Sequence, residues 1–568
     1  MPQTSLRIKF FLLMLALLCS LTFANLLLDT VHLRDLKIIN TQTQLTENDN
    51  SSRNLSGSTI RFTYDDQLVQ KSNNRLHIKI IQDALKSAFN FYEQFIQVKN
   101  PILSGLEVDC DFDLLPDLFK KTVYNTDIHF IVGLDYDEDS WLASAGPCGL
   151  QKTDNRPIIG FIIYNQKYLP SEDNGSFSSF EYDYLIKVTI HEMFHALVFH
   201  DDLYQYYVNS TPEQYGINLH KKPFLALPEV LSFTQQHFGC SDIKEVYLED
   251  ISLEGTAGCH WKKSLFYSDL MTGFLNSGDV TWSGINNALL KDSGWYDVKM
   301  DFHDRLFWGK DKGCDFYFQT CNEKPLPKEF CDLSNEKNST GYNYEGYNFK
   351  CQPLFPNTCP VQYSLNHTSC YGRVDKLNLI ENTMENFGSS FGWNSKAVIS
   401  SLSPKNSHFE VDPQQIQCYP QECIQKGDKI SIHFTIGSKI DKIQNVICEE
   451  DDQILTVDQY DGQLICPKIN NFCKQQFICK NHCNGRGFCM NQTCICAKGY
   501  SGEDCSIDNS NQEEEQQILD ANCNSYDDKN ECINCQKGFQ LIGGSCQKTS
   551  QQILLIQIFI IAFYLILI

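Results

Sequence analysis

The chain has 568 residues, too many for one small hydrophobic core, so we expect several domains. Hydrophobic residues make up 42% and aromatic residues 12% of the sequence, a composition typical of globular proteins and not of disordered ones. The formal net charge of -23 excludes nucleic acid and anionic membrane surfaces as the main partner, because both repel an acidic protein. The 26 cysteines indicate an oxidising compartment, since a cytosolic chain would have to keep all of them reduced.

Residues 1–24 have the pattern of a secretory signal peptide. Arg7 and Lys9 precede the apolar run FFLLMLALL, and the ending TFA follows. An N-terminal membrane anchor is the alternative, although the apolar run is short for a spanning helix. Along the secretory route the chain would offer seven Asn-x-Ser/Thr sequences for glycosylation. They begin at Asn50, Asn54, Asn174, Asn209, Asn338, Asn366 and Asn491.

Residues 25–57 are mostly polar and are interpreted as a propeptide or a linker. Residues 58–310 are predicted to form a catalytic domain of the α+β class. The stretches TIRFTYD, DIHFIVGLD and IIGFIIYN are strand candidates, and hydrophobic residues recur at helical spacing in IIQDALKSAFNFYEQFI. The next helix candidate, EYDYLIKVTIHEMFHALVFH, carries three histidines, and we expect it to pack on a mixed sheet formed by the strands.

The second half of the chain is richer in cysteine. Residues 311–472 are predicted to be a cysteine-rich domain in which disulfides replace part of the hydrophobic core. Residues 473–505 are predicted to be an EGF-like module, because six of their cysteines, from Cys479 to Cys505, have the spacing C-x3-C-x5-C-x4-C-x-C-x8-C, which resembles such a module. Residues 506–543 are an acidic spacer and a small cysteine cluster. Cysteine spacing alone leaves the connectivity open. The EGF resemblance implies three disulfides: Cys479 with Cys489, Cys483 with Cys494, and Cys496 with Cys505.

The C-terminus is apolar from Ile553 to the last residue, and nothing charged follows it. A GPI-attachment signal has small residues, a polar spacer and a terminal apolar tail. Gly543, Gly544 and Ser545 followed by a polar stretch fit that order, so residues 544–568 are predicted to be a GPI-attachment signal. A short tail anchor is the alternative. Either one would hold the protein to a membrane of the secretory pathway, with the cell surface as its expected location.

The most informative stretch is TIHEMFHALVFHDD, residues 189–202. His191 and His195 are four residues apart, so on a helix both imidazoles lie on one face. With Glu192 they form a His-Glu-x-x-His motif, in which two nitrogens bind Zn²⁺ and the carboxylate serves as general base. A surface helix with two unrelated histidines is the alternative to a metal site.

A catalytic zinc site needs a third protein ligand and one open coordination position. On a continuing helix, His200 lies about 140° around the axis from His195, so it is poorly placed for this role. The residues themselves leave the third ligand open among several histidines. The candidates are His200, His220, His237, His260 and His303.

Residues 253–273, LEGTAGCHWKKSLFYSDLMTG, resemble the leishmanolysin family of surface metalloproteases, which are metzincins. In that family a long insertion separates the second and third histidine ligands. The resemblance also takes in PEVLSFTQQHFGC, residues 228–240, and the region around DIHFIVG. It implies a metzincin-type catalytic domain in which His260 is the third ligand and Met271 is the Met-turn residue beneath the metal.

Two features depart from the family pattern. Val198 stands where a glycine usually follows the second histidine ligand, so we expect the chain to leave the helix differently. The family pattern also includes a propeptide cysteine placed on the zinc, whereas residues 25–109 of this chain contain no cysteine. Either another group keeps the proenzyme inactive, or the enzyme lacks this form of inhibition.

Together these features predict a cell-surface or secreted zinc endopeptidase that binds one Zn²⁺ through His191, His195 and His260, with Glu192 as general base. Its expected substrates are proteins or peptides, and no nucleic acid is expected as a partner. The alternative is a catalytically inactive adhesion protein that binds an extracellular partner through its EGF-like module. A zinc-dependent hydrolase of non-peptide substrates is a third hypothesis, since the sequence does not show the shape of the pocket.

Overall fold

The computed structural model divides into two compact units, Met1–Ser506 and Ile507–Ile568, which are described separately. The predicted signal peptide and the apolar C-terminal run lie outside the described residues. The described residues are 27–29, 37–39, 58–72, 74–109, 121–136, 141–169, 178–250, 256–273, 280–319, 327, 329–333, 339–347, 350–352, 359–363, 369–371, 388–405, 415–437, 444–474, 478–509, 523–526, 532–535, 539–542 and 545–548.

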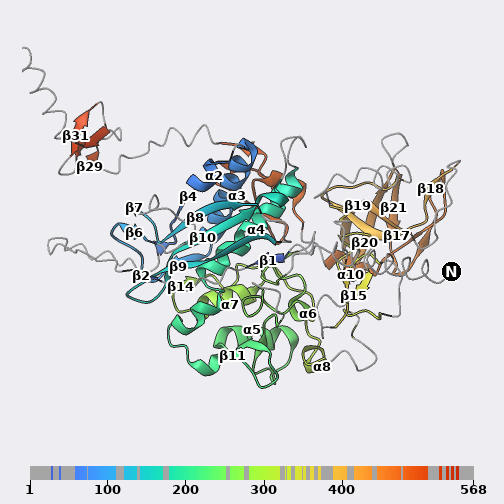
Figure 1. The fold of residues 1–568 in the computed structure, drawn as a ribbon. Coiled ribbons are helices and arrows are strands. Elements are labelled where there is room, and N and C mark those ends of the chain that lie inside the picture. The colour runs from blue at the N-terminus through green and yellow to red at the C-terminus, as the bar shows by residue number, and fades with distance from the viewer. Residues whose placement is uncertain are drawn as a thin grey trace, which may run out of the picture. The chain divides into compact units, whose positions relative to one another are not determined.

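The N-terminal region contains a mixed sheet (Figure 1). Its strands β4 (Phe62–Asp65), β8 (Ile128–Asp135) and β10 (Pro157–Asn165) are parallel to one another. Strand β9 (Trp141–Gln151) runs antiparallel to β10. Three of these four strands were predicted from their apolar runs. The fourth, β9, carries the small residues of ASAGPCG and lacks such a run.

Side chains on successive strand positions point to opposite faces of the sheet, and both faces are buried. Phe130 of β8 and Tyr164 of β10 belong to the main hydrophobic core. Ile131, next to Phe130, and Phe161, three positions before Tyr164, belong to a smaller core on the other face. The near-continuous apolar character of these strands follows from this double burial.

Two long helices, α3 (Arg75–Glu93) and α4 (Ser179–Leu197), pack on the sheet and on each other (Figure 1). Both have side chains that cap their first turn. Asn74 accepts hydrogen bonds from two backbone N–H groups of α3, and Ser178 with Glu181 forms a capping box at α4. The predicted α+β class, with the histidine-bearing helix on a mixed sheet, is confirmed.

Two short strands from the segment interpreted as a propeptide extend this sheet. β1 (Leu27–Asp29) and β2 (Lys37–Ile39) both pair with β9 in the parallel direction. Ile39 belongs to the smaller core. The polar composition of residues 25–57 did not predict these strands, because each is only three residues long.

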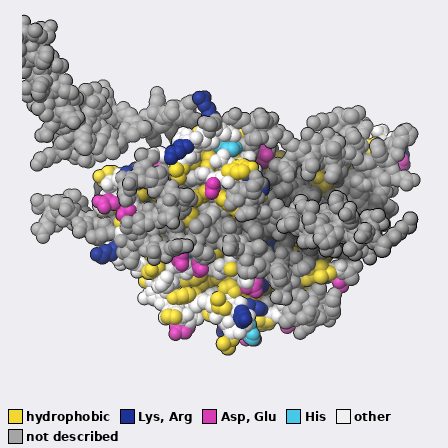
Figure 2. Space-filling model, in the orientation of Figure 1, with side chains coloured by type: hydrophobic (Ala, Val, Ile, Leu, Met, Phe, Trp, Pro, Cys, Tyr) yellow, Lys and Arg dark blue, Asp and Glu magenta, His cyan; other side chains and the backbone are white. Residues whose placement is uncertain are grey.

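The region that follows α4 consists of short elements around α5 (Pro228–Phe238) and α7 (Gly284–Asp292), with a disulfide between Cys240 and Cys314. Over α5 and β11 (Tyr215–Ile217), hydrophobic side chains are interspersed with polar and charged ones (Figure 2). The shorter elements here and near α3 are β3 (Ser58–Thr59), α2 (Gln67–Gln70), β5 (Ile96–Val98), β6 (Leu106–Val108), β7 (Lys121–Val123), η2 (Gln166–Tyr168), η4 (Asp201–Tyr206), η5 (Pro212–Gln214), β11 (Tyr215–Ile217), β12 (Pro223–Leu225), β13 (Val246–Tyr247), α6 (Lys263–Phe266), β14 (Tyr296–Val298) and α8 (Cys314–Tyr317).

The cysteine-rich region contains a second, antiparallel sheet with a hydrophobic core of its own. Its strands are β17 (Ser395–Ile399), β19 (Ile416–Lys426), β20 (Lys429–Ile436) and β21 (Gln444–Cys448). Smaller elements of this region are β15 (Lys350–Gln352), β16 (Val361–Tyr363), β18 (Ser403–Pro404), β22 (Ile454–Leu455), β23 (Tyr460–Asp461), β24 (Leu464–Ile465) and α10 (Ile469–Lys474). The disulfides here join Cys331 to Cys351, Cys370 to Cys418, Cys423 to Cys473 and Cys448 to Cys466. The expected density of disulfides is confirmed.

The EGF-like module consists of η6 (Lys480–Gly485) and the hairpin of β25 (Gly487–Met490) and β26 (Thr493–Cys496), followed by β27 (Tyr500–Ser501). Its disulfides have the pairing that the EGF resemblance implies. They join Cys479 to Cys489, Cys483 to Cys494, and Cys496 to Cys505.

The second unit contains the short strand β28 (Ile507–Asp508) and two hairpins. One is formed by β29 (Cys523–Tyr526) and β30 (Cys532–Cys535), the other by β31 (Phe539–Ile542) and β32 (Ser545–Lys548). Among the helices that the structure describes, none combines the length and the apolarity needed to cross a membrane.

Candidate metal centre

The helix α4 places His191 and His195 on one face, with their Nε2 atoms 2.9 Å apart. Both side chains are fully buried, as is Glu192 between them. The four-residue spacing produces this arrangement, because neighbours at that spacing lie one above the other on a helix. The two histidines that the motif predicts are therefore oriented toward one point.

His260 completes the group, since its Nε2 atom lies 3.1 Å from the Nε2 atoms of both His191 and His195. The loop that carries it turns at Gly258, whose φ of 82° favours glycine. Backbone hydrogen bonds fix the loop on both sides. Trp261 N–H donates to the Met271 carbonyl at 2.9 Å, and Glu249 N–H donates to the His260 carbonyl at 2.9 Å.

The second ring nitrogen of each histidine lies against a backbone carbonyl. The Nδ1 atom of His191 is 2.7 Å from the Leu270 oxygen, that of His195 is 2.8 Å from the Phe199 oxygen, and that of His260 is 3.0 Å from the Thr256 oxygen. A carbonyl only accepts, so Nδ1 carries the proton in all three rings. All three Nε2 atoms are then acceptors, and three acceptors that converge need a cation between them.

The spacing of these nitrogens fits a tetrahedral ion. Metal–nitrogen bonds of about 2.0 to 2.1 Å at tetrahedral angles place neighbouring nitrogens about 3.3 Å apart. The observed separations of 2.9 to 3.1 Å are close to that value. Burial lowers the pKa of His191 and His195 well below the usual range and that of His260 to about 4. The rings are therefore neutral at physiological pH, as metal ligands must be.

The other candidates for the third position are placed elsewhere. His200 is buried, but its Nδ1 atom accepts the backbone N–H of Asp202 at 3.3 Å, at the start of η4. His237 lies with Nε2 2.8 Å from the Trp308 carbonyl, and the Nδ1 atom of His303 lies 2.7 Å from the Asp304 carbonyl. His220 is exposed at the turn between β11 and β12. Of the five histidines considered, His260 is the one that joins the pair.

The helix ends at Leu197, earlier than the sequence pattern predicts. Val198 has φ -158° and ψ -40°, and the N–H groups of Val198 and Phe199 both donate to the Phe194 carbonyl. A glycine is not needed here, because this φ is negative. The turn brings the Phe199 carbonyl back to His195, so the exit from the helix itself fixes the orientation of a ring in the group.

Met271 is fully buried after the third histidine, and its turn is held by an acid that the sequence did not reveal. Asp269 accepts the N–H of Met271 at 2.8 Å, the N–H of Ser283 at 3.2 Å and an amide N–H of Asn286 at 3.1 Å. Burial raises the pKa of Asp269 to about 6. In the sequence, the signal that could have identified Asp269 is an acidic residue between the apolar stretch LFY and the predicted Met-turn.

Comparison with known proteins agrees with this geometry. The family model described as leishmanolysin matches residues 30–481, and one described as a teneurin-like EGF domain matches residues 479–508. A leishmanolysin-like peptidase of Caenorhabditis elegans is 28% identical over 220 residues, which is 32% of this chain and 32% of that protein. A leishmanolysin homolog of Crithidia fasciculata is 28% identical over 229 residues, 39% of this chain and 33% of that protein.

A third relative is a ciliated left-right organizer metallopeptidase of Danio rerio, 24% identical over 371 residues, which cover 59% of this chain and 52% of that protein. The chain spans about a third to a half of the length of these relatives. The leishmanolysin match covers most of the chain, and the EGF match begins within its last three residues. The chain therefore belongs to the leishmanolysin family of metallopeptidases and carries an EGF-like module.

Proposed function

We propose that the chain is a zinc endopeptidase that cleaves proteins or peptides, with one Zn²⁺ held by His191, His195 and His260. The observation that carries the proposal is the convergence of three buried Nε2 atoms, 2.9 to 3.1 Å apart, on rings whose Nδ1 atoms face carbonyls. Three imidazoles with an open fourth position are a ligand set typical of catalytic zinc. Membership of a metallopeptidase family supports peptide hydrolysis as the reaction.

Bound Zn²⁺ supplies a Lewis acid, which activates water for attack and polarises the scissile carbonyl. Glu192 takes the proton of the attacking water and then donates it to the leaving amine. Its fully buried place directly after His191 on α4 supports this role. The carbonyls that face the Nδ1 atoms keep the three rings in one orientation throughout the reaction.

We further propose that the protein acts at the cell surface or outside the cell. The disulfides support an oxidising compartment. Residues 1–24 would be the secretory signal and residues 544–568 the GPI-attachment signal, on the sequence patterns given above. Glycosylation at exposed sites such as Asn209 would follow from passage through that route.

The test is to measure zinc content and casein hydrolysis, with and without a chelator, on the purified protein and on Glu192→Gln. We expect the variant to keep its zinc and to lose activity by at least about a hundred-fold. Glu181→Gln is the matched control, because glutamine also completes the capping box at the start of α4. Full activity of Glu192→Gln, or activity that resists the chelator, would contradict the proposal.

A further inference from the structure

The EGF-like module shares the hydrophobic core of the catalytic domain. Phe488 and Met490, both on β25, are buried and belong to the same core as the helices α3 and α4. The ring of Phe488 lies 4.5 Å from the ring of Phe91 on α3, measured between centroids. A module that served only as a tethered adhesion domain would keep its apolar side chains in its own small core.

Directional hydrogen bonds add to this contact. An amide N–H of Asn90 on α3 donates to the Cys496 carbonyl at 2.6 Å. At the turn of the module's hairpin, the backbone N–H of Asn491 donates to Asp304 Oδ1 at 2.7 Å, and its side-chain amide donates to the His303 carbonyl at 2.9 Å. These bonds fix the orientation of the module as well as its position.

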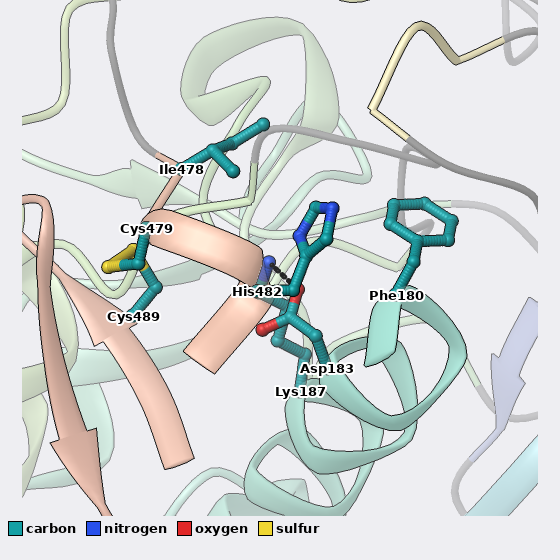
Figure 3. A pocket seen from close by; sticks show the side chains of 7 residues that line it. All are labelled: Phe180, Asp183, Lys187, Ile478, Cys479, His482 and Cys489. Carbon is teal, nitrogen blue, oxygen red and sulfur yellow. Dashed lines mark hydrogen bonds and ion pairs between the residues drawn. A yellow bond between two sulfur atoms is a disulfide. The ribbon is translucent and has the colours of Figure 1, made fainter. Parts of the chain in front are cut away.

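The module also meets the first half of α4. Side chains from the helix and from the module surround a small cavity between them (Figure 3). His482 of the module lies edge-on to Phe180, with ring centroids 5.2 Å apart. Beside it Lys187 and Asp183, one turn apart on α4, form an ion pair of 2.8 Å in which both side chains are buried. The residues around the cavity are Phe180, Asp183, Lys187, Ile478, Cys479, His482 and Cys489.

Gly485 marks the closest approach of the module's backbone to α4. Its φ is 64°, and a Cβ atom there would lie 2.4 Å from the Cβ of Tyr182 in the first turn of the helix. Real Cβ atoms do not approach so closely, so a larger residue would push the module and the helix apart. The glycine is thus required by the contact with α4 in addition to its backbone conformation.

A short chain of contacts joins the module to the metal-binding part of α4. Asp304 accepts the backbone N–H of Asn491 through Oδ1. Through Oδ2 it accepts the backbone N–H of Trp282 at 3.2 Å. The Trp282 ring lies 5.0 Å from the ring of Phe194. Phe194 is the residue before His195, so the packing that supports the second histidine is continuous with the docking surface of the module.

We propose that the EGF-like module is a positioning element of the peptidase. It holds α4 against the sheet so that His191, Glu192 and His195 keep the geometry needed for catalysis. This inference rests on the proposed function, because it assigns a role to the module in the same reaction. It also means that the face of the module formed by Phe488, Met490 and Gly485 is closed to an adhesion partner.

The first test uses the full-length protein and the substitution Gly485→Ala. We expect kcat to fall about ten-fold or more while KM changes little, because the reacting groups and not the substrate contacts are displaced. Hydrogen exchange of the α4 amides should accelerate in the same variant. The matched control is Gly427→Ala in the turn between β19 and β20, where φ is 60° and nothing lies within 4 Å of the added Cβ. It carries the same backbone strain without the contact.

A second pair of variants, with milder substitutions, provides the test if Gly485→Ala does not fold. Asn491→Asp removes the hydrogen bond to the His303 carbonyl and places a negative charge beside Asp304, at an exposed position. Thr493→Ala is its control, since both changes abolish the same glycosylation sequence and only the first touches the contact. We expect Asn491→Asp to lower kcat by about two- to five-fold and Thr493→Ala to leave it unchanged.

The inference is overturned if the Gly485 and Asn491 variants match their controls in kcat and in the hydrogen exchange of the α4 amides, while exchange of the module's own amides accelerates. Hydrogen exchange is measured without substrate. It therefore tests the coupling between module and helix even if the protein hydrolyses no peptide, an outcome that would remove the proposed function alone.

Discussion

The Nδ1 atom of His191 lies 2.7 Å from the carbonyl oxygen of Leu270, the residue that precedes Met271. The turn at Met271 thus contacts the three-histidine group through its backbone and orients His191. Asp269 holds that backbone from the other side, because its carboxylate accepts the N–H of Met271 and also binds Ser283. A buried acid two residues from Met271 therefore orients His191 without contacting it.

Asp269→Asn should weaken zinc binding about ten-fold, as changes behind metal-binding histidines commonly do. Asparagine retains one acceptor for Met271 but brings an NH₂ group against donors that the carboxylate accepted, so the turn relaxes and the Leu270 carbonyl moves. Zinc affinity measured by competition with a chromogenic chelator checks this. Asp242→Asn, at an exposed position, is the control. A lower unfolding temperature with unchanged zinc affinity would show that Asp269 stabilises the fold without orienting the histidine.

The sequence predicted the parts of this centre that depend on local spacing. His191, Glu192 and His195 follow from one helical repeat, and the apolar runs located three of the main strands. His260 lies on a separate loop, so the residues alone left it among five candidates and family resemblance was needed to select it. The Asp269 network joins backbone groups across the fold and has no periodic signature. The contacts of the EGF-like module with α3 and α4 were also beyond prediction, because the EGF resemblance implies only the disulfides within the module.

Substitution of the third histidine separates the competing ligand sets. His260→Ala should reduce bound zinc to well below one ion per chain and abolish proteolysis, since two imidazoles rarely hold the metal. His200→Ala should keep its zinc, because the Nδ1 atom of His200 accepts the N–H of Asp202 at the start of η4. Metal analysis by mass spectrometry after dialysis gives the comparison. Loss of zinc from the His200 variant with retention in the His260 variant would reverse the assignment.

Val198→Gly tests the one position in the histidine motif that departs from the family pattern. If the chain needed a glycine to leave α4, this change would raise stability. The structure indicates the opposite, because φ at Val198 is negative and its side chain is fully buried in the main core. Loss of the side chain and the added backbone freedom of glycine should together lower the free energy of unfolding by about 2 to 4 kcal/mol.

Val198→Ala is the matched control for that change, since it removes the same methyl groups but keeps the Cβ atom and the backbone restriction. We expect the alanine variant to lie between the parent and the glycine variant in urea unfolding, and both variants to bind zinc. A glycine variant more stable than the alanine variant would mean that the helix exit is strained. If stability falls in the order parent, alanine variant, glycine variant, valine is an alternative to the usual glycine at this position. The turn is then fixed by the packing of the valine side chain and by the Phe199 carbonyl, which faces His195.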